Sequence, residues 1–425
     1  MLNWAQQTDA SGGGPLVVVH SSKGSSIMGT NLSAHANTDA LLDVKNLFVD
    51  YHASSGAVHA VTDVNFTLKR GEILGLAGES GSGKSTLAYA ITCLLRPPAM
   101  ISGGEILYYP RPSQDGRDSS RVSITRLSKN GKSKHAKDGN GQSIEETKSI
   151  DLLQLSPAQL RDLRWNDLAI VFQSAMNALN PVMTVGSQIM DVLRTHRPDM
   201  RSDSRKQRAR ELFQLVGIAP DRLRSYPHEL SGGMRQRAII AIALVLSPEI
   251  LIMDEPTTAL DVLVQREILT EIMRLREKLG FAVIFITHDL SLLLELADHV
   301  AIMYAGRIVE KASRQDLYLH PRHPYSYGLL NSFPSLHGPR RKMAGIPGSP
   351  PDLRAVPPGC AFHIRCPMAI DACHKVLPSL LSMQGEESEQ LVACHLYDPA
   401  FNAEPPTTAD LASKYEALAE ESNAR

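Results

Sequence analysis

Short apolar segments alternate with glycine-rich and polar segments along most of this chain. Alternating apolar and polar positions over 41–44 and 58–68 predict two β-strands, with Gly56 in the turn between them. A further strand is predicted over 73–77, followed by a glycine-rich loop and a helix that begins near Lys84. A strand, a loop and a helix in this order are typical of an α/β nucleotide-binding core.

Later segments continue this alternation of strands and helices. The fully apolar run 250–253 predicts a buried parallel strand, and further strands are predicted over 168–172 and 281–287. The apolar run 238–246 is too short to cross a membrane, so it predicts a buried helix. Residues 191–216 are rich in arginine and predict a helix whose arginines lie on an exposed face.

Segments of unusual composition divide the chain. Residues 110–149 contain few apolar side chains and cannot bury enough surface to offset the entropy of ordering, so they predict a disordered insertion. Its lysines could contact anionic lipid or RNA, but a solvated loop is the favoured interpretation. The expected organisation is a flexible leader at 1–39, a nucleotide-binding domain at 40–320, an extension at 321–400 and a tail at 401–425.

Composition and charge narrow the classes of protein. The 425 residues carry a formal net charge of -1, which disfavours a general nucleic-acid binder. No stretch approaches the about eighteen consecutive apolar residues of a membrane-spanning helix. The first residues lack the basic and apolar pattern of a secretory signal. We therefore expect a cytosolic chain that acts at a membrane only through partners.

One glycine-rich loop fits the phosphate-binding pattern G-x-x-x-x-G-K-[ST]. Its glycines let backbone N–H groups surround phosphates, and the helix that follows offers its positive N-terminal end. Lys84 is expected to reach the β- and γ-phosphates, and the Ser85 hydroxyl to bind Mg²⁺. The predicted nucleotide-binding residues here are Gly78, Glu79, Ser80, Gly81, Ser82, Gly83, Lys84, Ser85 and Thr86.

Two carboxylates follow the buried strand 250–253. Ligands in open α/β sheets bind beyond the carboxyl ends of the strands, so Asp254 and Glu255 are placed for catalysis. Asp254 is expected to hold Mg²⁺, directly or through water. Glu255 is expected to polarise the attacking water.

A second anion-binding helix start is predicted at residues 228–237. Ser231 is expected to cap the helix, and Gly232 and Gly233 expose its N–H groups to an anion. A single chain with one phosphate loop does not need a second anion-binding site for the same nucleotide. The second site is explained if two chains face each other, because each nucleotide then lies between the phosphate loop of one chain and the Ser231 helix of the other.

These motifs together resemble the ATP-binding subunits of the ABC transporter superfamily. Residues 230–233 (Leu-Ser-Gly-Gly) are similar to the family's signature motif, and 259–261 (Ala-Leu-Asp) to its D-loop, which crosses the dimer interface. Positions that match single family residues are Gln173 of the Q-loop, the switch histidine His288, and Tyr51, which stacks on adenine.

The resemblance implies a fold and a set of ligands. It implies an ABC-type P-loop α/β domain with an antiparallel β subdomain and a helical subdomain, followed by a small cysteine-containing extension. ATP and Mg²⁺ are the implied ligands. Gln173, Ser85 and Asp254 would contact Mg²⁺, His288 the γ-phosphate, and Asp261 the dimer interface.

Further segments resemble the dipeptide and oligopeptide importer branch of this superfamily. They are 174–186, 323–330, 346–351, 359–362 and 365–367. The resemblance implies an ATPase at the cytoplasmic face of the cell membrane. Its partners would be two permease subunits, an extracytoplasmic solute-binding protein, and a second ATPase subunit, identical or distinct.

Other functions remain open at this point. Relatives in the same branch import nickel, glutathione or other small solutes. Soluble ABC ATPases of DNA repair or translation usually carry two cassettes or a long coiled coil, and many exporters are fused to membrane helices; the sequence has none of these features. A regulatory module without catalysis is disfavoured because Lys84, Asp254, Glu255 and His288 are all in place.

Four of the five cysteines lie in the extension: Cys360, Cys366, Cys373 and Cys394. Four thiolates can hold a [4Fe–4S] cluster or a tetrahedral zinc ion. Zinc sites more often show paired C-x₂-C motifs, which are absent here, so the irregular spacing and the Cys366-Pro367 step favour the cluster. Zinc and free thiols remain the alternatives.

Overall fold

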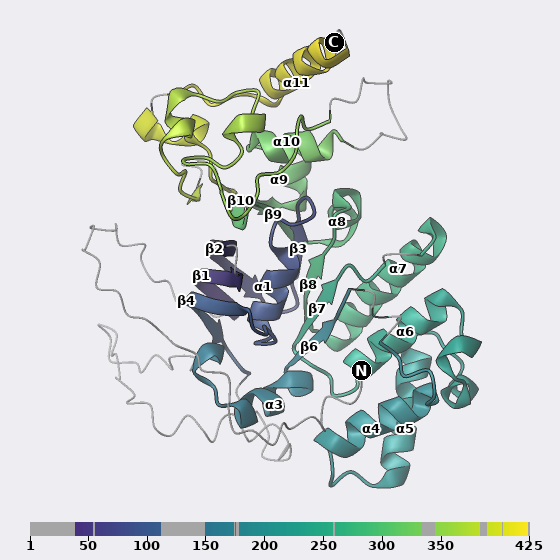
Figure 1. Ribbon diagram of the computed structural model, residues 1–425. Coiled ribbons are helices and arrows are strands. Elements are labelled where there is room, and N and C mark those ends of the chain that lie inside the picture. Colours follow the sequence, from purple (N-terminus) through teal and green to yellow (C-terminus); the bar gives the residue numbers. More distant parts are fainter. Residues whose placement is uncertain are drawn as a thin grey trace, which may run out of the picture.

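A computed structural model describes residues 39–53, 56–111, 149–173, 175, 178–257, 260–332, 345–382, 389–401 and 403–423. Nearly all of the predicted leader and insertion therefore lies outside the described residues. The same holds for Ser174 and Ala259, which belong to the predicted Q-loop and D-loop segments. In the described residues, a core of two β-sheets is flanked by helices, with the helices α4 and α5 at one end and the C-terminal segment at the other (Figure 1).

The first sheet is antiparallel. Its strands are β1 (Ala40–Ala53), β2 (Gly56–Lys69), β4 (Ala99–Tyr108) and β5 (Ile150–Asp151), in the order β2-β1-β4-β5. The two strands predicted on either side of Gly56 form this hairpin and extend beyond the predicted ranges. The sheet places the start of β2 and the end of β1 close to the phosphate loop.

The second sheet has a parallel centre and an antiparallel edge. Its parallel strands run in the order β9-β3-β8-β7-β6, and β10, β12 and β11 continue it beyond β9. Strands β3, β6, β7 and β8 confirm the four runs predicted from the sequence. The bounds are β3 Ile73–Ala77, β6 Leu168–Val171, β7 Ile250–Asp254, β8 Ala282–Ile286, β9 His299–Tyr304, β10 Arg307–Ser313, β11 Leu381–Ser382 and β12 Leu391–Val392.

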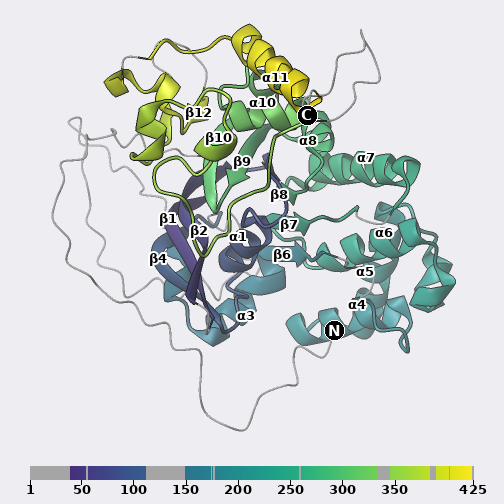
Figure 2. The same cartoon turned by 45° about the horizontal axis from the view of Figure 1, so that its top comes forward.

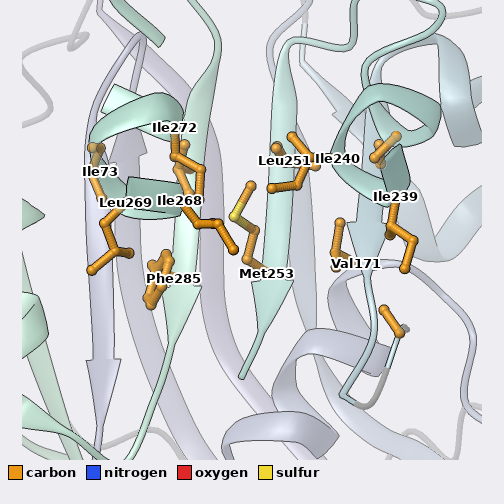
Figure 3. Packing of buried hydrophobic residues seen from close by; sticks show 14 of the residues in the cluster. Ile73, Val171, Ile239, Ile240, Leu251, Met253, Ile268, Leu269, Ile272 and Phe285 are labelled. Atoms are coloured by element: carbon orange, nitrogen blue, oxygen red, sulfur yellow. The ribbon is translucent and has the colours of Figure 1, made fainter. Parts of the chain in front are cut away.

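Helices cover both faces of the parallel strands, which explains why these strands are apolar throughout. On one face, Leu251 and Met253 of β7 pack with α6 (Gly232–Ala243) and α7 (Val262–Leu279), as Figure 3 shows. On the other face, Ile250 and Ile252 pack in the cluster that contains α1 (Lys84–Ile91). Successive residues of β7 therefore pack in two different hydrophobic clusters, one on each face of the sheet.

The predicted helix over 191–216 is wrong in one respect, because the structure has two helices there. Helix α4 (Val185–His196) ends before Pro198, and α5 begins after Arg201 (Ser202–Leu215). The residue before a proline is disfavoured in helical conformation. Arg197 has φ −134° and ψ 64°, which ends α4 at this point.

The C-terminal segment adds helices and two short strands to the core. Strand β12 pairs with β10, so the extension continues the main sheet. The fully buried Glu310 of β10 accepts hydrogen bonds from the backbone N–H groups of Arg322 and His323. Tyr415 of α11 (Thr408–Asn423) donates a hydrogen bond of 2.9 Å to the Pro324 carbonyl at the start of α10 (Pro324–Leu330). Figure 2 shows α11 beside α10.

The remaining elements complete the described fold. None of the described helices is both long and apolar enough to span a membrane. The other α-helices are α3 Pro157–Asn166, α8 Leu290–Leu296, α9 Arg314–Leu319, α10 Pro324–Leu330 and α11 Thr408–Asn423. The 3₁₀ helices are Leu152–Gln154, Pro220–Arg224, Pro227–Glu229, His363–Arg365, Asp371–His374, His395–Tyr397 and Pro399–Phe401.

Candidate functional site

The glycine-rich loop joins β3 to the N-terminus of α1. Gly83 precedes the helix with φ 101°, and a Cβ atom there would lie 2.2 Å from the Ala60 carbonyl oxygen. Only glycine fits this position without displacing the backbone. Lys84 is buried, and its Nζ donates hydrogen bonds of 2.8 Å to the carbonyls of Gly78 and Glu79. The ammonium is therefore held over the loop that the sequence predicts to bind phosphates.

Asp254 ends β7 beside the start of α1. The Ser85 hydroxyl donates a hydrogen bond of 3.1 Å to Asp254 Oδ1. Burial raises the pKa of the Asp254 carboxyl, while the Ser85 hydrogen bond lowers it. Asp254 Oδ2 is buried and has no hydrogen-bond partner among the described residues. A carboxylate oxygen in need of a partner, next to a hydroxyl, fits the oxygen ligands that Mg²⁺ prefers.

Three polar side chains from separate loops meet beyond the ends of the strands. Gln173, after β6, donates a hydrogen bond of 3.0 Å from Nε2 to Glu255 Oε2. His288, after β8, lies 3.2 Å from Glu255 Oε1 through its Nδ1. The Glu255 backbone has φ 47°, and its N–H donates to the Ile286 carbonyl at 2.9 Å. The predicted catalytic residues are thus brought together by three neighbouring strands.

The charges of this cluster act on Lys84. Burial lowers the pKa of the Lys84 ammonium below its ordinary value. Neighbouring carboxylates, of which Glu255 has the largest effect, shift it in the opposite direction. The cation therefore lies within electrostatic range of the acids.

Tyr51 reaches the same region from β1. Its hydroxyl lies 3.2 Å from Thr86 Oγ1 in the first turn of α1. The hydroxyl of this β1 residue thus lies beside the start of α1. This placement is compatible with a ring that contacts the base of a nucleotide.

The predicted second anion-binding helix belongs to the other face of the main sheet. Ser231 caps α6 by accepting a hydrogen bond of 3.3 Å from the Met234 N–H, as expected. Asp261 caps α7 in the same way, with 3.0 Å from the Val264 N–H. A Cβ atom on Gly233 would lie 2.8 Å from Val264 Cγ1, so glycine lets the two helix starts approach each other. Helix α6 packs in a different cluster from α1.

The sequence favoured a metal site in the cysteine-rich tail. The Cys360 N–H donates a hydrogen bond of 2.9 Å to the Cys373 carbonyl, so parts of the tail are adjacent. Burial raises the pKa of the Cys360 thiol to about 11 and that of Cys366 to about 12. Metal ligands are thiolates, which this burial disfavours. Among the described residues, no group of three or more His, Cys, Asp or Glu side chains could hold a metal ion. The expectation of an iron–sulfur or zinc centre is not supported.

Two residues of the extension reach the phosphate loop and were not predicted. Arg365 forms an ion pair with the Glu79 carboxylate, and the Tyr325 hydroxyl accepts a hydrogen bond of 2.9 Å from the Glu79 N–H. One feature of the sequence could have indicated this contact. Glu79 is an acidic side chain in a loop predicted to bind anions, so a cationic partner that neutralises it is expected. Which of the many arginines supplies it depends on the tertiary fold.

Comparison with known proteins gives consistent matches over most of the chain. The family profile described as "ABC transporter" matches residues 61–258, and that described as "Oligopeptide/dipeptide transporter, C-terminal region" matches 309–373. The chain is 41% identical over 357 residues to a probable peptide ABC transporter ATP-binding protein, y4tR, of Sinorhizobium fredii, covering 83% of this chain and 95% of that protein.

Two better-described relatives are similarly close. The chain is 40% identical over 344 residues to the dipeptide transport ATP-binding protein DppD of Bacillus subtilis, covering 80% of this chain and 90% of that protein. It is also 40% identical over 346 residues to the oligopeptide transport ATP-binding protein OppD of Escherichia coli, covering 81% and 91%. The two family profiles match parts of both the nucleotide-binding core and the extension.

Proposed function

The chain belongs to the ABC transporter family and is an ATP-hydrolysing subunit, and from this premise we propose that it powers the import of dipeptides or oligopeptides. The observation that carries the ATPase role is the cluster around Glu255, which Gln173 and His288 both contact. The peptide cargo is supported by the extension, whose profile is that of oligopeptide and dipeptide transporters.

Each residue of the cluster has a distinct part in the proposed hydrolysis. The Glu255 carboxylate accepts a proton from the attacking water, and His288 and Gln173 fix the orientation of that carboxylate. The phosphate-loop N–H groups and Lys84 bind the β- and γ-phosphates. Ser85, Asp254 and Gln173 would hold Mg²⁺, which would supply positive charge to balance the charge that develops on the phosphates.

We further propose that two ATPase subunits share each nucleotide. Ser231, Gly232 and Gly233 present the N-terminus of α6, which packs on the other face of the main sheet from α1. A helix N-terminus binds anions through its free N–H groups. The partner's phosphate loop would supply the nucleotide that this helix start binds, with Asp261 at the shared interface. ATP then favours the closed pair because it binds the closed pair better than the open one.

The proposed contact with the membrane subunits lies beside Gln173. A largely apolar cavity of about 300 Å³ is lined by Phe172 of the Q-loop, Trp165 of α3, Val192 of α4 and Ile239 of α6. Nearby, Val182 leaves 79% of its surface exposed. A short amphipathic helix of a permease would bury these groups and push on Gln173. The chain would thereby be held at the cytoplasmic face of the membrane as a peripheral subunit.

The cargo is tested by transport in the native host. A strain that lacks this chain is complemented with the wild type or with the Glu255→Gln variant, and uptake of labelled dipeptide, tetrapeptide, glutathione and nickel is measured. We expect the wild type alone to restore peptide uptake. Restored uptake of glutathione or nickel without peptide would assign the same motor to another solute.

The partners are tested by co-purification of the tagged chain from membranes of the same host. Two multispan permeases, a second ATPase subunit and a peptide-loaded binding protein are expected. Recovery of ribosomes or DNA-repair factors without a permease would overturn the transport role and leave the ATPase chemistry in place.

A further inference from the structure

The C-terminal extension reaches into the phosphate loop through one ion pair. Arg365 Nη1 lies 2.6 Å from Glu79 Oε2, and Nη2 lies 3.0 Å from Glu79 Oε1. This two-point pairing joins residues that are 286 positions apart in the sequence. Paired donors of a guanidinium on one carboxylate give geometric specificity in addition to charge. Arg365 is only 5% exposed, so solvent weakens this pair less than an exposed one.

The Arg365 guanidinium has several further partners besides Glu79. Its Nε donates a hydrogen bond of 2.7 Å to the Pro347 carbonyl, and Nη2 donates one of 3.3 Å to the Gly348 carbonyl. The Tyr304 hydroxyl lies 3.3 Å from Nη1, and the Tyr304 ring centroid lies 5.8 Å from the guanidinium carbon. Arg365 thus connects the segment 347–348 of the extension and the core strand β9 to Glu79. Its orientation leaves little freedom to make a different pair.

Glu79 is held at three points, and each point has a different partner. Its N–H donates a hydrogen bond of 2.9 Å to the Tyr325 hydroxyl, and its carbonyl accepts one of 2.8 Å from Lys84 Nζ. Its carboxylate forms the ion pair with Arg365. The backbone of the same residue therefore contacts the phosphate-binding lysine on one side and the C-terminal segment on the other.

We propose that Arg365 is a positioning residue for ATP binding, which neutralises the Glu79 carboxylate and makes the extension part of the nucleotide site. A carboxylate in a phosphate-binding loop repels a polyphosphate, and the repulsion is strong where water is partly excluded. Arg365 cancels that charge through its two contacts with the carboxylate oxygens. This inference rests on the ATP-binding role of the loop given above.

The contact also makes the extension responsive to nucleotide. Two sites that share a contact influence each other reciprocally, so an extension that stabilises the ATP-binding form of the loop is itself stabilised by ATP. Amide hydrogens of residues 345–382 should exchange more slowly when ATP is present. The effect should be lost when the ion pair is removed.

The test is a double-mutant cycle in the assembled transporter. Arg365→Gln is expected to raise KM for ATP about tenfold with a smaller change in kcat, since the uncompensated Glu79 carboxylate opposes binding. In an E79Q background the same Arg365→Gln change should raise KM much less. Arg365→Lys should lie between, because an ammonium supplies the charge but not the two-point geometry.

Matched controls separate this role from a structural one. Arg354→Gln removes a guanidinium of the same extension from a surface pair with Asp352, and KM should not change. If Arg365→Gln raises KM equally in the wild-type and E79Q backgrounds, Arg365 only anchors the extension and the inference is overturned. An unchanged KM in the folded Arg365→Gln variant would overturn it too.

The remaining outcomes are also decisive. If Arg365→Gln fails to fold, the comparison of Arg365→Lys with its E79Q double variant decides in the same way. If residues 345–382 of the wild type exchange amide hydrogens at the same rate with and without ATP, the proposed coupling between the extension and the nucleotide site is wrong. A wild-type complex that hydrolyses no ATP would instead count against the proposed function, which keeps the two failures distinguishable.

Discussion

Glu255 Oε1 lies 3.2 Å from His288 Nδ1, although the two residues follow different strands of the main sheet. Gln173, after a third strand, donates to the other carboxylate oxygen. The parallel strands β6, β7 and β8 are adjacent and end at the same edge, which gives three loops one meeting point. The carboxylate is thus fixed at both oxygens before any substrate binds. This is the arrangement expected of a group that must accept a proton in a defined direction.

The Glu255→Gln variant should bind ATP and fail to hydrolyse it. The amide keeps the shape of the side chain but cannot take a proton from water, so we expect kcat to fall by at least about a hundredfold. ATP affinity, measured with a fluorescent analogue, should change little. The control is Glu277→Gln on the exposed side of α7. Near-normal turnover in Glu255→Gln would show that another group acts as the base.

The Ser85→Ala variant should need more Mg²⁺. Ser85 donates to Asp254 Oδ1 at 3.1 Å, and both side chains are proposed ligands of the ion. Removing one oxygen ligand should raise the Mg²⁺ concentration for half-maximal hydrolysis by about tenfold or more. The measurement is a Mg²⁺ titration of ATPase activity at fixed ATP. Ser204→Ala on the exposed face of α5 serves as control. An unchanged Mg²⁺ titration in Ser85→Ala would show that Ser85 does not bind the ion.

The sequence predicts those parts of the fold that local patterns determine. The strand 73–77 is predicted with its observed bounds, because a short apolar run between polar turns has one simple interpretation. Lys84, Asp254 and Glu255 were identifiable because their chemistry requires fixed spacing next to such strands. The structure adds that Asp254 Oδ2 lacks a partner among the described residues, which no sequence pattern reveals.

Other features depend on contacts between distant segments. The contact of Arg365 with Glu79 could not be predicted, because nothing near either residue in the sequence points to the other. The metal site predicted in the cysteine tail also depends on such contacts, because residue types alone do not give the relative positions of the thiols. The described residues contain no group of three or more His, Cys, Asp or Glu side chains that could hold a metal ion, so this prediction is not supported. The merging of α4 and α5 into one predicted helix came from giving Pro198 too little weight.

The Tyr51→Ala variant should lower ATP affinity while Tyr51→Phe should not. The Tyr51 hydroxyl contacts Thr86, but the role we propose for Tyr51 is that its ring would stack on the base of the nucleotide. Stacking on an aromatic side chain contributes on the order of 1–3 kcal/mol, so we expect about a tenfold rise in Kd. Equilibrium binding of ATP and of triphosphate without a base separates the effects. A loss that is equal for both ligands, or one that appears in Tyr51→Phe, would contradict ring stacking.

His323 should make the stability of the folded chain depend on pH. The side chain is 1% exposed and caps α10 by accepting a hydrogen bond from the Tyr325 N–H at Nδ1. Its ring centroid lies 5.7 Å from that of Phe362, with an angle of 56° between the two rings. The Glu310 carboxylate accepts a hydrogen bond of 2.9 Å from the His323 backbone N–H. Burial lowers the pKa of the imidazole from 6.5 to about 3. The folded protein therefore keeps this histidine neutral over a range in which the unfolded chain protonates it.

The sign of the effect follows from the proton count. Between pH 6.5 and about 3 the unfolded state binds the extra proton, so His323 costs stability as pH falls, by up to about 1.4 kcal/mol per pH unit. His323→Asn keeps a capping oxygen without a titratable ring and should flatten this dependence, whatever its effect at neutral pH. The free energy of urea unfolding at pH 7.5, 6 and 5 measures it, with His52→Asn as the exposed control. Parallel pH curves for the wild type and His323→Asn would show that this histidine does not titrate between the two states.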